Sequence, residues 1–221
     1  MIILNFKTYP QCTGQKVLDV LKELDNNRKN TDDFNEIVYI APAMIDLNRA
    51  VLDFPELNIM CQHTDAIEDG SKTGWSPVPS IKNLGVEITM LNHSEHRVKP
   101  NELKNQIRFI QENGIKVVVC CEDTKEASKL LEAKPYAIAY EPKELIGSGR
   151  SVSNEKPEIV KEFIEICSGK TLPLIGAGVS TGKDIKVGLE LGAKGFLIAS
   201  AFTKAENRTE KINEFISPYL T

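Results

Sequence analysis

The fold of this chain is decided by the stretch Ile115-Lys116-Val117-Val118-Val119-Cys120-Cys121. Its apolar side chains fall on both faces of an extended segment, and a strand covered on both faces belongs to a parallel sheet under helices. Comparable short runs recur along the chain and alternate with amphipathic stretches. The expected strands are Ile2–Phe6, Ile37–Ala41, Leu57–Gln62, Glu87–Asn92, Ile115–Cys121, Tyr136–Tyr140, Leu172–Gly176 and Gly195–Ala199.

Eight such strand–helix units without a break in composition predict an α/β fold, a closed (β/α)8 barrel, with an open doubly wound sheet as the rival. Apolar residues three and four apart mark the helices, and glycine or polar residues mark their ends. The first helix is expected to stop before the polar run Asp25–Asp33. A chain of 221 residues leaves room only for trimmed helices and short loops. We therefore expect one catalytic domain over residues 1–221.

Composition excludes several classes of protein. The 27 basic and 31 acidic residues give a net charge of -4 without runs of one sign, which does not favour binding to nucleic acid or to an anionic membrane. No apolar run approaches the ~18 residues of a membrane span. The five cysteines lack metal-type spacing, so we interpret them as buried thiols in a reducing compartment. A soluble cytoplasmic protein is expected.

Reactive side chains gather at the expected carboxyl ends of the strands, where barrel enzymes hold their chemistry. Together they supply a cation, an imidazole, a base and small residues with accessible backbone donors. These residues are Asn5, Lys7, His93, Glu141, Gly178, Ser180, Ala199 and Ser200.

Glu141 stands at the mouth of a buried strand, where partial loss of water suits a general base. Pro142 stiffens the start of the following loop, while Gly147 and Gly149 loosen its end. This segment is therefore expected to open and close as a lid.

Two other interpretations are weaker. The spacing His93-Ser94-Glu95-His96 offers too few ligands for zinc, so no metal is expected. The segment Gly176–Asp184 resembles a nucleotide phosphate loop but has Asp184 where serine or threonine is needed. Its glycines still lead into a helix expected to begin near Ser180 or Thr181, which exposes amides to an anion. A phosphorylated substrate and proton abstraction next to a carbonyl, without a cofactor, are expected.

Five motifs in one order make the chain resemble the triosephosphate isomerase family, particularly its short archaeal form. The resemblance implies the TIM-barrel fold and runs from Ile3 to Ser200. The motifs are Asn5-x-Lys7-Thr8-Tyr9, Asn92-His93-Ser94-Glu95-x-Arg97, Glu141-Pro142-x-Glu144-Leu145-Ile146-Gly147-x-Gly149, Gly176-Ala177-Gly178-Val179-Ser180 and Leu197-x-Ala199-Ser200.

The resemblance implies interconversion of dihydroxyacetone phosphate and D-glyceraldehyde 3-phosphate through an enediol, in glycolysis and gluconeogenesis. It also implies a short helix after His93, whose dipole keeps the imidazole neutral. The implied catalytic residues are Glu141 as base, His93 as electrophile, Lys7 as electrostatic anchor, Asn5 as helper of the substrate oxygen, and Glu95. The implied substrate and phosphate contacts are Ile146, Gly147, Gly178, Ser180, Ala199 and Ser200.

Two alternatives stay open: another phosphosugar isomerase or lyase on a phosphate-binding barrel, and a non-catalytic barrel that acts as a scaffold.

The connection at residues 63–79 is too long for a plain link and carries Trp75, the one tryptophan. In the resembled family this loop docks beside a neighbouring active site, where the residue matching Thr73 braces the one matching Asn5. A homo-oligomer, dimer or tetramer, is expected.

Overall fold

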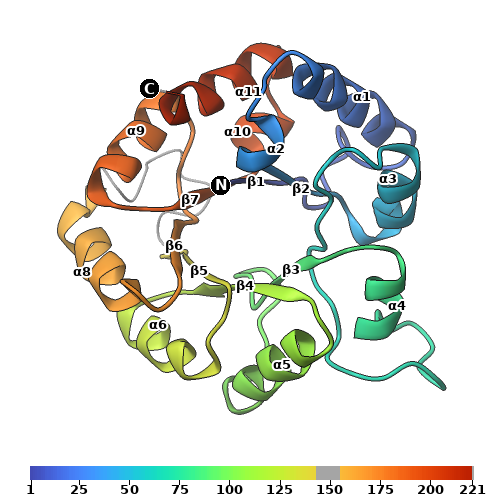
Figure 1. Cartoon of the computed structure of the whole chain (residues 1–221), viewed down its shortest axis with the longest axis vertical. Helices are drawn as coiled ribbons and strands as arrows, with labels where there is room; N and C mark the ends of the chain where they lie inside the picture. The colour runs from blue at the N-terminus through green and yellow to red at the C-terminus, as the bar shows by residue number, and fades with distance from the viewer. Residues whose placement is uncertain (143–154, 221) are drawn as a thin grey trace.

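The computed structural model describes residues 1–142 and 155–220. Within these ranges, seven parallel strands form one sheet in the order β2-β1-β7-β6-β5-β4-β3, which curls into a ring (Figure 1). The strands are β1 (Ile2–Asn5), β2 (Val38–Ala41), β3 (Ile88–Leu91), β4 (Lys116–Cys121), β5 (Ala137–Tyr140), β6 (Leu172–Ile175) and β7 (Gly195–Ile198). The predicted α/β barrel is confirmed.

The third expected strand, Leu57–Gln62, is reduced to two isolated parallel bridges. Ile59 pairs with Ile40 of β2, and Cys61 pairs with Thr89 of β3. Because each side of the segment matches its neighbour at only one residue, the ladder is too short for a regular strand. The bridges nevertheless close the ring, since β2 and β3 are the two edges of the sheet.

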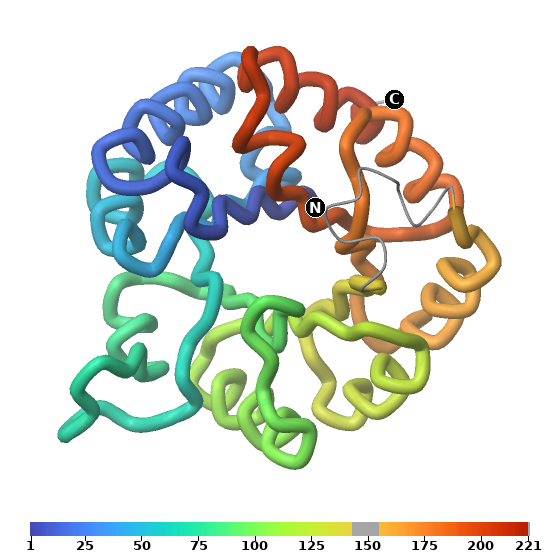
Figure 2. Tube along the Cα trace, turned by 180° about the vertical axis from the view of Figure 1, so that it is seen from behind, coloured from blue at the N-terminus to red at the C-terminus, as the bar shows by residue number. Residues whose placement is uncertain are grey.

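Helices cover the outside of the ring (Figures 1 and 2). They are α1 (Gln15–Lys29), α2 (Phe34–Ile37), α3 (Leu47–Asp53), α4 (Val78–Asn83), α5 (Pro100–Glu112), α6 (Thr124–Leu130), α8 (Pro157–Cys167), α9 (Gly182–Leu191), α10 (Ser200–Thr203) and α11 (Arg208–Ile216). Several of them span two turns or fewer, as the short chain requires.

The expected end of the first helix is wrong, because α1 runs through the polar residues to Lys29. Asp25 pairs there with Arg28 at 2.9 Å and with Lys29 at 2.5 Å. Residues three and four apart share a helix face, so such pairs support another helical turn instead of ending it.

The strand pattern that decided the fold follows from two apolar layers. Val117 and Val119 belong to the layer between sheet and helices, whereas Val118 and Cys120 belong to the interior of the barrel. Each strand is therefore apolar on both faces. All five cysteines are free and buried.

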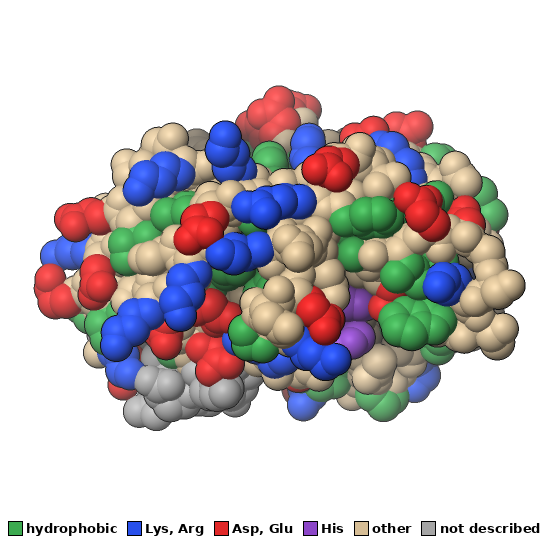
Figure 3. All heavy atoms as spheres, turned by 90° about the horizontal axis from the view of Figure 1, so that it is seen from below, with side chains coloured by type: hydrophobic (Ala, Val, Ile, Leu, Met, Phe, Trp, Pro, Cys, Tyr) green, Lys and Arg blue, Asp and Glu red, His purple; other side chains and the backbone are tan. Residues whose placement is uncertain are grey.

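The surface mixes both signs of charge, as the face in Figure 3 shows. In the described ranges no helix is long and apolar enough to cross a membrane. The 63–79 loop projects from the ring beside α4 (Figures 1 and 2), and the side chain of Trp75 on it is 58% exposed.

Candidate active site

A cavity of about 300 Å³ lies at the carboxyl ends of the strands. Its lining includes eight residues expected from the sequence: Asn5, Lys7, His93, Glu141, Gly178, Ser180, Ala199 and Ser200. Glu95 lines an adjoining cavity that shares Asn5, Lys7 and His93. Two expected contacts, Ile146 and Gly147, lie outside the described residues together with most of the proposed lid.

An imidazole–carboxylate pair faces this cavity. Nε2 of His93 lies 3.3 Å from Oε1 of Glu141, and both residues are buried. The backbone N–H of Glu95 donates to Nδ1 of His93 at 3.2 Å. A nitrogen that accepts a hydrogen bond carries no proton, so the ring proton of a neutral His93 sits on Nε2, toward Glu141.

The expected short helix after His93 is absent from this described part of the chain. The segment forms a turn in which the His96 N–H donates to the His93 carbonyl at 2.8 Å, and the next helix begins at Pro100. Asn92 holds the turn, because its Oδ1 accepts from the Val98 N–H at 3.0 Å. One backbone donor at Nδ1, instead of a helix dipole, therefore selects the tautomer.

Lys7 reaches the cavity through a strained backbone. The expected strand ran to Phe6, but β1 ends at Asn5, and Lys7 has a φ of 47°. Asn5 Oδ1 accepts from the Lys7 N–H at 2.9 Å, and Gln62 Nε2 donates to the Lys7 carbonyl at 3.1 Å. A non-glycine residue in this region persists only when its surroundings hold it, which is common at functional sites. The ammonium of Lys7 pairs with Glu95 at 2.6 Å.

Two neighbours that sequence reasoning did not assign to catalysis restrict Glu141. A Cβ on Gly176 would lie 2.5 Å from Glu141 Cγ, so only glycine leaves room for this side chain. Cys120 is buried beside it, and burial, together with the Glu141 carboxylate, raises the pKa of the Cys120 thiol well above its usual value. The sequence motif contained this glycine, but it did not reveal the contact between Gly176 and Glu141.

In the expected anion-binding segment, the helix begins close to the predicted position. The hydrogen-bond donors of Ser180, however, are not free for an anion. Helix α9 begins at Gly182 after the cap Thr181. The Asp184 carboxylate accepts from the Ser180 N–H at 3.0 Å and from the Ser180 hydroxyl at 3.2 Å. Ser180 therefore lines the cavity with both donors already engaged. Gly178, at φ 72°, adopts a backbone that favours glycine.

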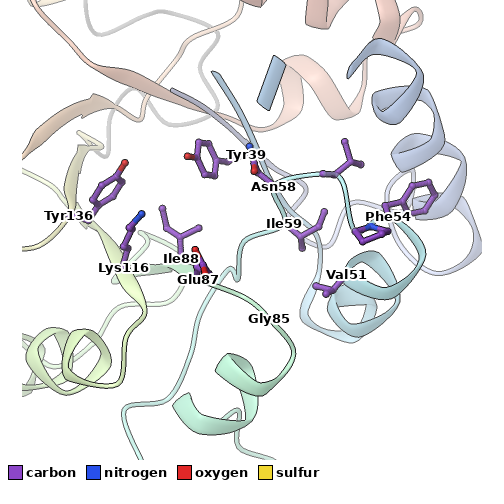
Figure 4. Close-up of a pocket in the computed structure, with 12 residues that line it drawn as sticks. Tyr39, Val51, Phe54, Asn58, Ile59, Gly85, Glu87, Ile88, Lys116 and Tyr136 are labelled. Atoms are coloured by element: carbon purple, nitrogen blue, oxygen red, sulfur yellow. The ribbon is translucent and has the colours of Figure 1, made fainter. Parts of the chain in front are cut away.

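A second cavity, of about 260 Å³, lies at the opposite, amino-terminal ends of the strands (Figure 4). It places the Lys116 ammonium 5.2 Å from the ring centroid of Tyr136. The buried imidazole–carboxylate pair belongs to the first cavity, which is therefore the candidate active site.

Comparisons with known proteins agree with this assignment. The family model described as triosephosphate isomerase matches residues 1–216. The triosephosphate isomerase of Thermoplasma volcanium is 34% identical, over 97% of this chain and 98% of that protein. The enzymes of the same name from Methanobrevibacter smithii and Methanocaldococcus jannaschii are each 33% identical over 98% of this chain, and over 97% and 98% of their own lengths.

Proposed function

Because this chain belongs to the triosephosphate isomerase family, we propose that it interconverts dihydroxyacetone phosphate and D-glyceraldehyde 3-phosphate. One observation carries the assignment of roles: the neutral tautomer of His93 directs Nε2 toward the buried Glu141 carboxylate inside the cavity. A neutral donor beside a carboxylate suits proton transfer next to a carbonyl. Triosephosphate isomerase is itself a standard example of this pairing.

In the proposed reaction the substrate carbonyl takes the place of Glu141 as acceptor for the Nε2 proton of His93. Glu141 then removes a proton from the neighbouring carbon, and His93 protonates the carbonyl oxygen, which gives an enediol. Glu141 returns its proton to the other carbon while His93 recovers one from the other oxygen. Both groups end in their starting states, so no cofactor is consumed.

Lys7 and Asn5 are proposed to stabilise the charge that develops on the substrate oxygens. The Lys7 ammonium is held by Glu95, and the Asn5 side chain fixes the Lys7 backbone. Groups that are already oriented need little rearrangement during the reaction, and such preorganisation is a large part of catalysis.

The segment from Pro142 to Gly149 is proposed to close over the bound substrate, with Ile146 and Gly147 in contact with it. An enediolate exposed to water can expel its phosphate, so the site must exclude water until reprotonation. The phosphate is proposed to meet backbone amides at Gly178, Ala199 and Ser200, with Ser180 contributing only after release from Asp184.

An assay that starts from dihydroxyacetone phosphate, with a dehydrogenase that oxidises glyceraldehyde 3-phosphate as coupling enzyme, tests the proposal. Wild-type protein should turn over the triose phosphate, and Glu141→Gln should abolish turnover. The same change at Glu190, an exposed glutamate on α9, is the matched control and should have no effect. Failure of the wild type would favour another phosphosugar enzyme or a scaffold, two alternatives that the family assignment does not favour.

The loop at residues 63–79 is proposed to bind a second copy of the chain, beside its active site. Its base is fixed, since the Thr64 hydroxyl donates to the Ser76 carbonyl at 2.9 Å and the Ser76 N–H to Asp65 Oδ2 at 2.7 Å. Its tip leaves Trp75 58% exposed, and Ile45 near the cavity end of β2 is 84% exposed. A large exposed apolar side chain on a loop with a fixed base, and a second one after β2, suit a dimer or tetramer interface.

The setting is proposed to be cytoplasmic, in glycolysis and gluconeogenesis, with residues 1–221 forming one catalytic domain. The five buried free thiols support a reducing compartment.

A further inference from the structure

The charged residues that line the candidate active site differ in how their charge is compensated. Among the described residues, the lining carries two cations, Lys7 and Lys204, and one acid, Glu141. Lys7 is already paired with Glu95 at 2.6 Å. Within the described ranges no acid lies in salt-bridge range of Lys204. Its ammonium instead lies 5.0 Å from the ring centroid of Tyr9.

Other groups near the expected phosphate position are compensated as well. Asp184 engages both donors of Ser180. Lys211, whose ammonium reaches the Ser180 carbonyl, pairs with Glu214 at 2.7 Å. A phosphate dianion that leaves water needs more positive charge than a lysine–glutamate pair supplies. Of the two lysines that line the cavity, Lys204 is the one whose charge is not offset by a carboxylate among the described residues.

Lys204 has an exposed side chain on a backbone that is held in place. Phe202, two residues earlier, stacks on Phe6 with ring centroids 6.0 Å apart and an angle of 12°. The Lys204 N–H donates to the Ser200 carbonyl at 3.1 Å, and the Tyr9 N–H donates to the Phe6 carbonyl at 3.2 Å. The segments that carry Lys204 and Tyr9 are therefore locked together. An aromatic face holds an ammonium without neutralising its charge, so the cation stays available to an anion.

We propose that Lys204, supported by the Tyr9 ring, is a second cation for the substrate phosphate and a determinant of specificity for phosphorylated trioses. The inference rests on the proposed isomerase function and adds a side-chain contact to the backbone amides. Lysine acts at such a site as a point charge, so its positive charge matters more than its shape.

The decisive variant is Lys204→Met, which keeps the length of the side chain and removes its charge. We expect kcat/KM for glyceraldehyde 3-phosphate to fall by about tenfold to a hundredfold, the range for losing a hydrogen bond to a charged group. The inhibition constant of inorganic phosphate should rise by a similar factor. Isomerisation of glyceraldehyde, which has no phosphate, should not change. Lys204→Arg should retain most of the wild-type phosphate affinity.

The chain offers a matched control in Lys116→Met. Lys116 lies 5.2 Å from the ring centroid of Tyr136, nearly the same arrangement, but at the opposite end of the barrel (Figure 4). This variant loses the same charge and the same type of ring contact. It should leave the kinetics for both substrates and the inhibition by phosphate as in the wild type.

Three results would overturn the proposal. The first is that the Lys204→Met variant gives the same values as the Lys116→Met variant in every measurement. Another is an equal loss with glyceraldehyde and with its phosphate, which would indicate a structural role. The third is an unchanged affinity for inorganic phosphate in calorimetry. Calorimetry needs no turnover, so it still decides the role of Lys204 if the wild type is not an isomerase. Thermal unfolding of each variant identifies any that fails to fold.

Discussion

Replacing Gly176 by alanine tests whether the position of Glu141 is set by contact. The added Cβ would lie 2.5 Å from Glu141 Cγ and 3.2 Å from the Tyr140 carbonyl oxygen. Nonbonded carbons approach to about 3.5 Å at best, so the Glu141 side chain must retreat by roughly 1 Å. Misplacing a reacting group by about 1 Å can lower a rate roughly a hundredfold. We expect kcat to fall by about that factor, and stability to fall by ~1–3 kcal/mol from overpacking.

Gly188→Ala is the matched control, because its Cβ would lie 2.4 Å from Phe196 Cε1, in the layer between α9 and the sheet. A comparable clash there should reduce stability without moving the Glu141 side chain. Steady-state kinetics in the coupled assay and thermal unfolding should be measured on both variants. The reasoning is wrong if Gly176→Ala folds and keeps a kcat close to that of the wild type, or if Gly188→Ala loses as much activity per folded molecule.

Three further changes test the other assignments. Glu141→Asp should lower kcat by about a hundredfold or more while KM barely moves, because the carboxylate retracts by one methylene; a variant that keeps most of its turnover would mean another base. Deleting residues 144–148 should divert the enediol to methylglyoxal and free phosphate, and an unchanged product ratio would contradict the argument for water exclusion. Trp75→Glu should dissociate the oligomer and lower activity together, since buried aromatic anchors contribute ~2 kcal/mol or more at interfaces. Light scattering that finds a monomeric wild type would refute this last expectation.

The sequence was sufficient for the fold wherever local pattern decides structure. Val117 and Val119 face the helices, and Val118 faces the barrel interior. For this reason, one run of valines was enough to predict a sheet that is buried on both faces. Leu57–Gln62 has a similar pattern but forms only bridges. The number of residues that pair in a strand depends on its register with both neighbouring strands, and the sequence of the segment alone does not determine that register.

The candidate site was predictable where strand order determines which residues lie close together. Glu141, His93 and Lys7 follow strand ends, so topology alone brings them together. Some of their supports come from distant positions: Gln62 is 55 residues away from Lys7, the residue whose carbonyl it holds. Such contacts leave no local pattern.

The helix expected after His93 failed for a local reason. Pro100 opens a helix readily at its first position, and the Asn92 side chain keeps the preceding residues in a turn. A motif can thus point to a candidate catalytic histidine without revealing which backbone donor selects its tautomer.

The bridges at Ile59 and Cys61 give the barrel a seam, closed by single residues where the other junctions have ladders. The segment ends at Gln62, which holds the Lys7 backbone, and continues directly into the 63–79 loop. A neighbouring subunit that binds this loop would favour the closed seam by mass action. If the proposed oligomer forms, activity per molecule would fall on dilution, because the seam from which Gln62 holds the Lys7 backbone would lose its partner's support.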